Sequence, residues 1–217
     1  ENLMKEADTY GFDGFNLDFE SLKAEAGPHY VQFIREMSVA CRKKGLVLSV
    51  DNYVPSAYTA FYNRREQGIV ADYVIVMGYD EHYAGGEAGP VASLPYVEKG
   101  IADTLKEVPK EKVINSVPFY TRIWTEKDGK TTSKAYGIRD AKNWIKENNI
   151  ELEWQDDLGV YYGESSNENG VQSIWMEEEK SLGLKVDLIN EYDLAGAACW
   201  KLGFEDRSIW EIVSQVK

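Results

Sequence analysis

The fold is decided by ten consecutive residues, Gly11-Phe12-Asp13-Gly14-Phe15-Asn16-Leu17-Asp18-Phe19-Glu20. Apolar side chains at 15, 17 and 19 alternate with Asn16, Asp18 and Glu20, and this period of two predicts a β-strand over residues 12–20. One face of the strand would carry three polar groups, each ~6.6 Å from the next at ~3.3 Å of rise per residue. The other face is apolar and is expected to pack under helices.

The polar face of this strand admits two interpretations. Burying a ladder of carboxyls is costly unless they are hydrogen-bonded or take part in chemistry. Two like charges this close favour one protonated acid beside one ionised partner, so Asp18 and Glu20 would suit acid catalysis. The alternative is an edge strand whose polar face lies in water, as in many half-exposed sheets. The spacing alone does not decide between them.

The composition is that of a globular protein with one sizeable core. The 217 residues are 43% hydrophobic and include six Trp and fourteen Tyr. A formal net charge of −13 argues against nucleic acid and anionic membrane surfaces as partners. No apolar run approaches the ~18 residues of a membrane-spanning helix. The polar segment at residue 1 predicts no signal peptide.

Cysteine and histidine are scarce in this sequence. Cys41 lies in a predicted amphipathic helix and Cys199 in a predicted apolar strand, so we expect two buried free thiols. A disulfide between them would require the two side chains to face each other. His29 and His82 are the only histidines of the sequence, and we therefore expect no metal site and no other cofactor.

Short strands rich in β-branched residues alternate with helices along the chain. The alternation predicts a parallel sheet with right-handed crossovers. The expected strands span residues 12–20, 46–51, 72–80, 112–120 and 194–202. The expected helices span residues 1–9, 28–44, 57–68, 94–108 and 208–216. A (β/α)8 barrel and a doubly wound sheet both fit this pattern.

Polar and aromatic residues collect where the expected strands end. In a (β/α)8 barrel that end carries the active site. These residues are Asp18, Glu20, Asp51, Asn52, Tyr53, Tyr79, Asp80, Phe119, Tyr120 and Trp200.

The segment 124–193 is too long for a plain connection and needs structure of its own. We read it as a small α+β insertion with helices over 138–148 and 177–192. Short strands are expected at 151–155, 159–163 and 171–176. Glu177, Glu178 and Glu179 are expected at the amino terminus of the second helix, where its dipole stabilises negative charge.

Residues 13–20 resemble the signature D-G-x-[DN]-x-D-x-E of glycoside hydrolase family 18, the chitinase family. Every specified position matches, with Asn16 where many members have Asp. Two further segments are similar to later motifs of the family, in the right order. They are Met77-Gly78-Tyr79-Asp80, which resembles M-x-Y-D, and Ala198-Cys199-Trp200, which resembles the last barrel strand.

The resemblance covers the whole chain and implies a (β/α)8 barrel that carries an α+β insertion. In this family the signature strand is the fourth of the barrel. Counted from the signature strand and including it, the sequence contains only five expected strands. Residues 1–217 are therefore expected to form the carboxyl-terminal part of a barrel that lacks the first three strands. Two free sheet edges would allow self-association. The isolated chain would be expected to hydrolyse poorly.

The resemblance also implies roles for the matched residues. Glu20 is the general acid, Asp18 hydrogen-bonds the acetamido N–H of the substrate, and Tyr79 donates to its acetamido oxygen. No carboxylate acts as nucleophile, because that acetamido oxygen attacks the anomeric carbon. Trp200 is expected to stack beneath the sugar, and Tyr53 to line the cleft. The full set of expected substrate-binding residues is Asn16, Tyr53, Met77, Asp80 and Trp200.

Two functions follow from the resemblance. The first is a retaining glycosidase that cleaves N-acetylglucosamine polymers, either chitin oligomers or peptidoglycan. Residues 173–206 are similar to the bacterial branch that includes spore cortex-lytic N-acetylglucosaminidases, which implies an extracellular, cell-wall or spore location. The second is an inactive sugar-binding or coat-structural protein, as in lectin-like members, which commonly lose the terminal acid. Catalysis is favoured by the retention together of Glu20, Asp18, Tyr79 and Trp200.

Overall fold

The computed structural model describes residues 1–168 and 170–217, and these form two compact units. The first unit comprises Glu1–Met77, Gly100–Asn115 and Asp193–Ala195. The second comprises Gly78–Lys99, Ser116–Tyr192 and Gly196–Lys217. Helix α4 (Leu94–Thr104) and strand β4 (Val113–Pro118) contribute residues to both units.

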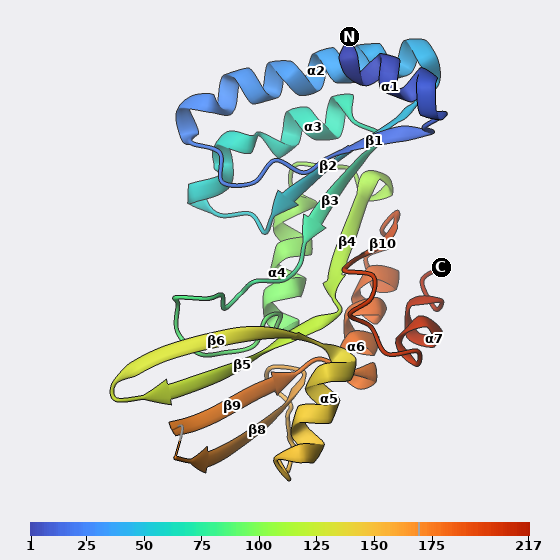
Figure 1. Ribbon diagram of the computed structural model, residues 1–217. Helices are drawn as coiled ribbons and strands as arrows, with labels where there is room; N and C mark the ends of the chain where they lie inside the picture. Colours follow the sequence, from blue (N-terminus) through green and yellow to red (C-terminus); the bar gives the residue numbers. More distant parts are fainter. Residues whose placement is uncertain (169) are drawn as a thin grey trace. The chain divides into compact units, whose positions relative to one another are not determined.

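A parallel sheet contains β1, β2 and β3 of the first unit, and its last strand, β10, belongs to the second unit (Figure 1). Its strands run in the order β1-β2-β3-β4-β10, so the five predicted barrel strands are all present among the described residues. The register places Asn16 of β1 beside Ser49 of β2, and Asp51 of β2 beside Ile75 of β3. The bounds are β1 (Gly14–Leu17), β2 (Val47–Tyr53), β3 (Tyr73–Met77) and β10 (Gly196–Trp200).

Helices of the first unit lie along one face of β1, β2 and β3 (Figure 1). Helix α2 contacts β2 and α3, and α3 contacts β3. The bounds of the helices, with the short 3-10 turns labelled η, are α1 (Asn2–Tyr10), η1 (Ala24–Ala26), α2 (Gly27–Lys44), η2 (Ala57–Tyr62), α3 (Arg64–Val70) and η3 (Lys110–Lys112).

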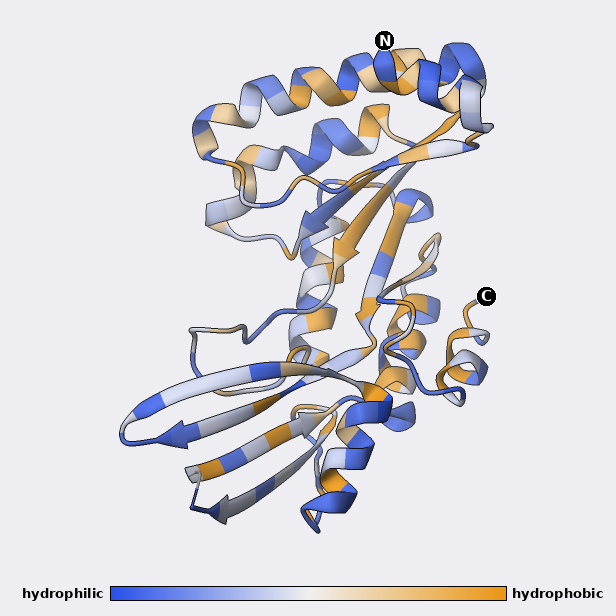
Figure 2. Ribbon diagram, in the orientation of Figure 1, coloured by the Kyte–Doolittle hydropathy of each residue, from blue (hydrophilic) through white to orange (hydrophobic). Residues whose placement is uncertain are grey.

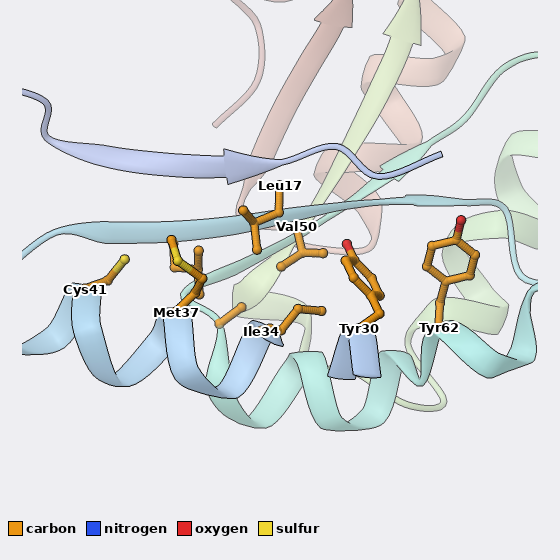
Figure 3. Close-up of a cluster of buried hydrophobic side chains, with 9 residues drawn as sticks. Leu17, Tyr30, Ile34, Met37, Cys41, Val50 and Tyr62 are labelled. Carbon is orange, nitrogen blue, oxygen red and sulfur yellow. The ribbon is translucent and has the colours of Figure 1, made fainter. Parts of the chain in front are cut away.

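The core of this unit lies between α2 and the sheet (Figure 3). Helix α2 supplies one buried stripe, spaced three or four residues apart, as an amphipathic helix requires. In Figure 2 hydrophobic and hydrophilic bands alternate along α2, whereas β3 is hydrophobic over most of its length. The buried cluster consists of Leu17, Tyr30, Ile34, Met37, Cys41, Leu48, Val50, Tyr62 and Ala71.

Two predicted elements of the first unit are shorter or broken in the structure. Strand β1 ends at Leu17, three residues before the predicted end at 20, and the chain turns at Ser21 with a left-handed φ of 56°. The predicted helix 57–68 is divided at Asn63, which has a left-handed φ of 53°. The Asn63 side chain accepts a hydrogen bond from the backbone N–H of Glu66 (3.2 Å) and so caps α3.

The second unit is built on an antiparallel sheet with the strand order β6-β5-β9-β8-β7 (Figure 1). Helix α5 contacts β5 and β6, and helix α6 contacts β8, β10 and α7. The bounds are β5 (Tyr120–Lys127), β6 (Lys130–Gly137), α5 (Ile138–Glu147), β7 (Glu153–Gln155), β8 (Val160–Asn167), β9 (Gly170–Met176), α6 (Glu179–Glu191) and α7 (Ile209–Val213). The boundaries 124–193 of a separate insertion stay a prediction.

The hairpin β5–β6 was missed by the sequence-based prediction. Asp128 and Gly129 connect its strands with φ values of 52° and 70°. Two left-handed residues in a two-residue loop match the twist of antiparallel strands, and Asp-Gly is a strong signal for such a turn. The signal was present in the sequence, but the polar strand after it lacks the apolar alternation on which the prediction relied.

The two cysteines are free, as predicted. Cys41 is buried in α2, but Cys199 is only half-buried, so the expectation that both thiols are buried is wrong for Cys199. Within residues 1–168 and 170–217, no helix is long and apolar enough to cross a membrane.

Candidate active site

The signature residues lie at the carboxyl end of β1. Asn16 belongs to the strand, whereas Asp18 and Glu20 follow its last residue, Leu17. All three polar side chains are exposed. Of the two interpretations left open by the spacing, the exposure agrees with a polar face in water and not with a buried carboxyl ladder. Exposure is compatible with catalysis, because a polymer must reach the acid.

Two tyrosines fix the turn that carries Glu20. The hydroxyl of Tyr53, at the end of β2, donates to Glu20 Oε2 (3.0 Å) and accepts from the backbone N–H of Ser21 (3.1 Å). The hydroxyl of Tyr62 donates to the carbonyl oxygen of Phe19 (3.0 Å). Tyr53 was predicted to line a cleft. The structure places it against the predicted acid, and contact between Tyr53 and a sugar stays a prediction.

The amide of Asn16 joins β1 to β2 through side chains. Its Nδ2 donates to Ser49 Oγ (2.9 Å) and to Asp51 Oδ1 (2.7 Å). Asp51 is half-buried on the same face of the sheet. Burial raises the pKa of Asp51 to about 6; the hydrogen bond from Asn16 lowers this pKa, and the charges of Asp18 and Glu20 raise it. The sequence-based prediction gave Asp51 no role.

The raised pKa of Asp51 predicts a pH-dependent cost to stability. Between pH ~4 and ~6 the folded protein holds a proton on Asp51 that the unfolded chain has lost, so stability falls as pH rises through this window. Replacing Asp51 by Asn removes the cost. At pH 8 the variant should be more stable by up to about 3 kcal/mol, and at pH 4 by much less. Urea unfolding at both pH values measures this, and an equal difference at both would contradict it.

A second group of predicted residues gathers in the second unit. Tyr79 and Asp80 follow β3, and Asp80 adopts a left-handed φ of 57°. The Tyr120 hydroxyl donates to Asp80 Oδ1 (2.5 Å), and Arg122 Nη2 lies 3.7 Å from the same oxygen. Burial, followed by the charge of Asp80, raises the pKa of Tyr120. Asp80 is therefore held by two side chains of β5.

Aromatic rings surround this carboxylate. The Tyr120 ring contacts Tyr79, with centroids 6.1 Å apart, and Trp200, with centroids 5.3 Å apart, in both cases edge to face. Trp200 is 43% exposed, which leaves its ring available to a sugar. Met77, also predicted to bind substrate, is the buried last residue of β3 in the first unit.

Tyr120 and Arg122 received no role from the sequence. The available signal was the spacing of Tyr120 and Arg122, which places both side chains on one face at the start of a strand. Among the described residues, no group of three or more His, Cys, Asp or Glu side chains is arranged to hold a metal ion.

Comparison with known proteins assigns the chain to a family. The model of glycosyl hydrolases family 18 matches residues 1–205. The chain belongs to this family. The resemblance found in the signature, the M-x-Y-D segment and the last strand is thereby confirmed.

Bacterial relatives support the predicted branch. The chain is 30% identical over 220 residues to an uncharacterized glycosylase, YvbX, of Bacillus subtilis (strain 168), covering 98% of the chain and 64% of YvbX. It is 27% identical over 221 residues to the cortical fragment-lytic enzyme of the same organism, covering 98% of the chain and 51% of that enzyme. The chain therefore spans about half to two thirds of the length of these curated relatives.

A solved structure supports the fold. The chitinase of Chromobacterium violaceum ATCC 12472 superposes with a TM-score of 0.93 at 28% identity, covering 99% of this chain and 69% of that chain. The spore cortex-lytic enzyme SleL of Bacillus megaterium QM B1551 superposes with a TM-score of 0.88 at 23% identity, covering 98% and 51%. The predicted partial (β/α)8 fold is confirmed.

Proposed function

We propose that this chain carries the catalytic residues of a retaining glycosidase that cleaves β-linked N-acetylglucosamine polymers with the help of the substrate's acetamido group. One observation carries the proposal. Glu20, the terminal acid of the family signature, is exposed and is held by a hydrogen bond from Tyr53 (3.0 Å). A general acid needs a fixed position and access to the leaving oxygen, and Glu20 has both.

In the first step, Glu20 gives its proton to the glycosidic oxygen as the bond from that oxygen to the anomeric carbon breaks. The acetamido oxygen of the same sugar forms a new bond to the anomeric carbon and closes an oxazolinium ring. Asp18 accepts a hydrogen bond from the acetamido N–H and stabilises the positive charge that develops. The carboxylate of Glu20 then takes a proton from water and becomes an acid again. The water oxygen bonds to the anomeric carbon, and the bond from that carbon to the acetamido oxygen breaks, which opens the ring.

The family resemblance also assigns sugar-binding roles to residues of the second unit, and the structure describes these residues within that unit. Tyr79 donates to the acetamido oxygen, Asp80 accepts from sugar hydroxyls, and Trp200 offers an exposed ring for stacking. Tyr120 and Arg122 support this proposal, since they hold the Asp80 carboxylate in place before any sugar arrives. Their contribution is one of orientation.

The names of the relatives are compatible with either of two polymers as the substrate. The cortical fragment-lytic enzyme favours peptidoglycan, and the Chromobacterium chitinase favours chitin oligomers. Both polymers contain the 2-acetamido group that the mechanism requires. The proposed location, extracellular or at the cell wall or spore, follows from the cortex-lytic relatives. Self-association through strand edges stays a prediction.

A thiazoline analogue of N-acetylglucosamine tests the proposal. It copies the cyclised acetamido intermediate, and mimics of high-energy intermediates bind ~10²-fold or more tightly than substrates. The full-length protein should be inhibited competitively, with an inhibition constant at least ~10²-fold below the KM for a matched oligosaccharide. The matched control is N-acetylglucosamine, the same sugar without the fused thiazoline ring. Turnover that the thiazoline does not inhibit would contradict the proposal, and sugar binding without any turnover would indicate the lectin-like alternative.

A further inference from the structure

The carboxyl group of Asp51, on β2, lies next to the side-chain amide of Asn16, on β1. Asn16 stands where many family members have Asp, and the Asp51 carboxylate lies within 2.7 Å of its Nδ2. Strand register explains the approach: Asn16 lies beside Ser49, and Asp51 is the next residue on the same face of β2. A carboxyl is therefore present beside the signature, but the neighbouring strand supplies it.

We propose that Asp51 is a positioning residue. Located on β2, it supplies the carboxyl group that an Asp at position 16 would supply from β1. The inference rests on the proposed function, since it concerns the orientation and the charge of the groups around Glu20. It assigns Asp51 no contact with substrate. Asp51 acts through Asn16 and through its negative charge.

The hydrogen bonds of Asn16 support this assignment. An amide nitrogen has two hydrogens, and Asn16 gives one to Ser49 Oγ and the other to Asp51 Oδ1. Both donors are therefore committed to β2. Only the Asn16 Oδ1 acceptor remains to interact on the side of β1, so β2 determines which way the amide faces.

The charge of Asp51 supports a second part of the role. The ionisable groups that interact with it are Asp18 and Glu20 from the end of β1 and Tyr30 from α2. Asp51 titrates near pH 6, and above that pH it adds a negative charge beside these two carboxyls. The charge at this end of β1 and β2 therefore changes near pH 6, which is why replacing Asp51 is expected to alter the pH profile.

The first test exchanges the carboxyl between strands in the full-length protein. Asp51→Asn should lower kcat at least tenfold with little change in KM and should remove the ionisation near pH 6 from the pH profile of kcat/KM. The exchange Asn16→Asp/Asp51→Asn returns a carboxyl to the pair and should recover activity to within about threefold of the parent. The control Ser49→Ala removes an uncharged acceptor of the same amide and should keep the midpoint near pH 6.

Three results would overturn the proposal. Asp51→Asn could retain the parental rate and pH profile, the exchange could be no more active than Asp51→Asn, or Ser49→Ala could abolish the ionisation as completely as Asp51→Asn. A normal Asp51→Asn enzyme beside an inactive Glu20→Gln enzyme would remove Asp51 from the mechanism and leave the proposed function standing.

The second test does not depend on activity. The Asp51 side-chain carboxyl carbon is followed by NMR as pH is raised from 4 to 8. Because the hydrogen bond from Asn16 lowers the pKa of Asp51, Asn16→Ala should move the midpoint to higher pH. An unchanged midpoint would show that the two side chains are not paired. A parent protein that hydrolyses nothing would refute the proposed function, and this titration would still test the pairing.

Discussion

Replacing Glu20 by glutamine is expected to lower kcat/KM of the full-length protein by ~10²- to 10⁴-fold, the usual contribution of a general acid. Glutamine has the shape of the acid and can still accept the hydrogen bond from Tyr53, but it cannot give up a proton. Binding of N-acetylglucosamine oligomers should therefore survive. Steady-state hydrolysis and calorimetric binding on the same preparation measure the two effects separately.

The matched control is Glu25→Gln, the same chemical change five residues further along the chain. Glu25 is exposed in η1 and has no part in the proposed site. Its rate should equal that of the parent protein. If Glu20→Gln hydrolysed oligomers as fast as Glu25→Gln, another group would have to be the acid and the assignment of the signature would be wrong.

The largest expected effect on stability comes from a buried ion pair in the second unit. Lys185 Nζ lies 3.1 and 3.0 Å from the two carboxylate oxygens of Glu177, and neither side chain has any exposed surface. Replacing Lys185 by Met would leave a buried carboxylate without its partner. Breaking such a pair from one side costs about 3–5 kcal/mol, and urea unfolding should show a loss of this size.

Two comparisons make this measurement specific. Glu177→Met/Lys185→Met should recover most of the loss, because an apolar pair of similar volume can replace a buried ion pair. Lys110→Met breaks the exposed pair with Asp193, whose side chains are 54% and 79% exposed, and should cost less than about 1 kcal/mol. Equal losses for Lys185→Met and Lys110→Met would contradict a special role for the buried pair.

This pair also corrects the sequence-based prediction for Glu177. Glu177, Glu178 and Glu179 were expected together at a helix amino terminus. The structure confirms this for Glu179, which begins α6, and for Glu178, whose side chain accepts from the N–H of Ser181 as a cap. Glu177 is instead buried before the helix and pairs with Lys185. Three identical residues in a row give no sequence signal for which one turns inward. The pairing of Glu177 with Lys185, eight residues later, is seen only in the folded structure.

The parts of the fold that follow from local periodicity could be predicted. The strand at 46–51 and the helix at 28–44 agree with β2 (Val47–Tyr53) and α2 (Gly27–Lys44) to within two residues. In each of these two elements the apolar residues repeat with a single, constant period, and a glycine or proline marks one end. The end of β1 could not be predicted in this way. The chain leaves the sheet after Leu17 while the alternation continues to Glu20, because Tyr53 and Tyr62 bind the following turn.

The candidate site also contains residues that could be predicted from the sequence and residues that could not. Glu20, Asp18, Tyr79 and Trp200 could be named because they occupy motif positions. Asp51 could be placed at a strand end, but its contact with Asn16, 35 positions away, could not be predicted. Arg122 could not be named at all, since its role comes from a contact with Asp80, 42 positions away. Such contacts depend on strand register, and no single stretch of sequence determines it.

The central claim is that the substrate's own acetamido group is the nucleophile at the site of Glu20. The most direct test compares two oligosaccharides that differ only in the sugar at the cleaved bond, which is N-acetylglucosamine in one and glucosamine in the other, with products identified by mass. The full-length protein is expected to cleave the acetylated chain, with retention at the new reducing end, and to leave the deacetylated chain intact. Efficient cleavage of the deacetylated chain would show that the protein supplies its own nucleophile.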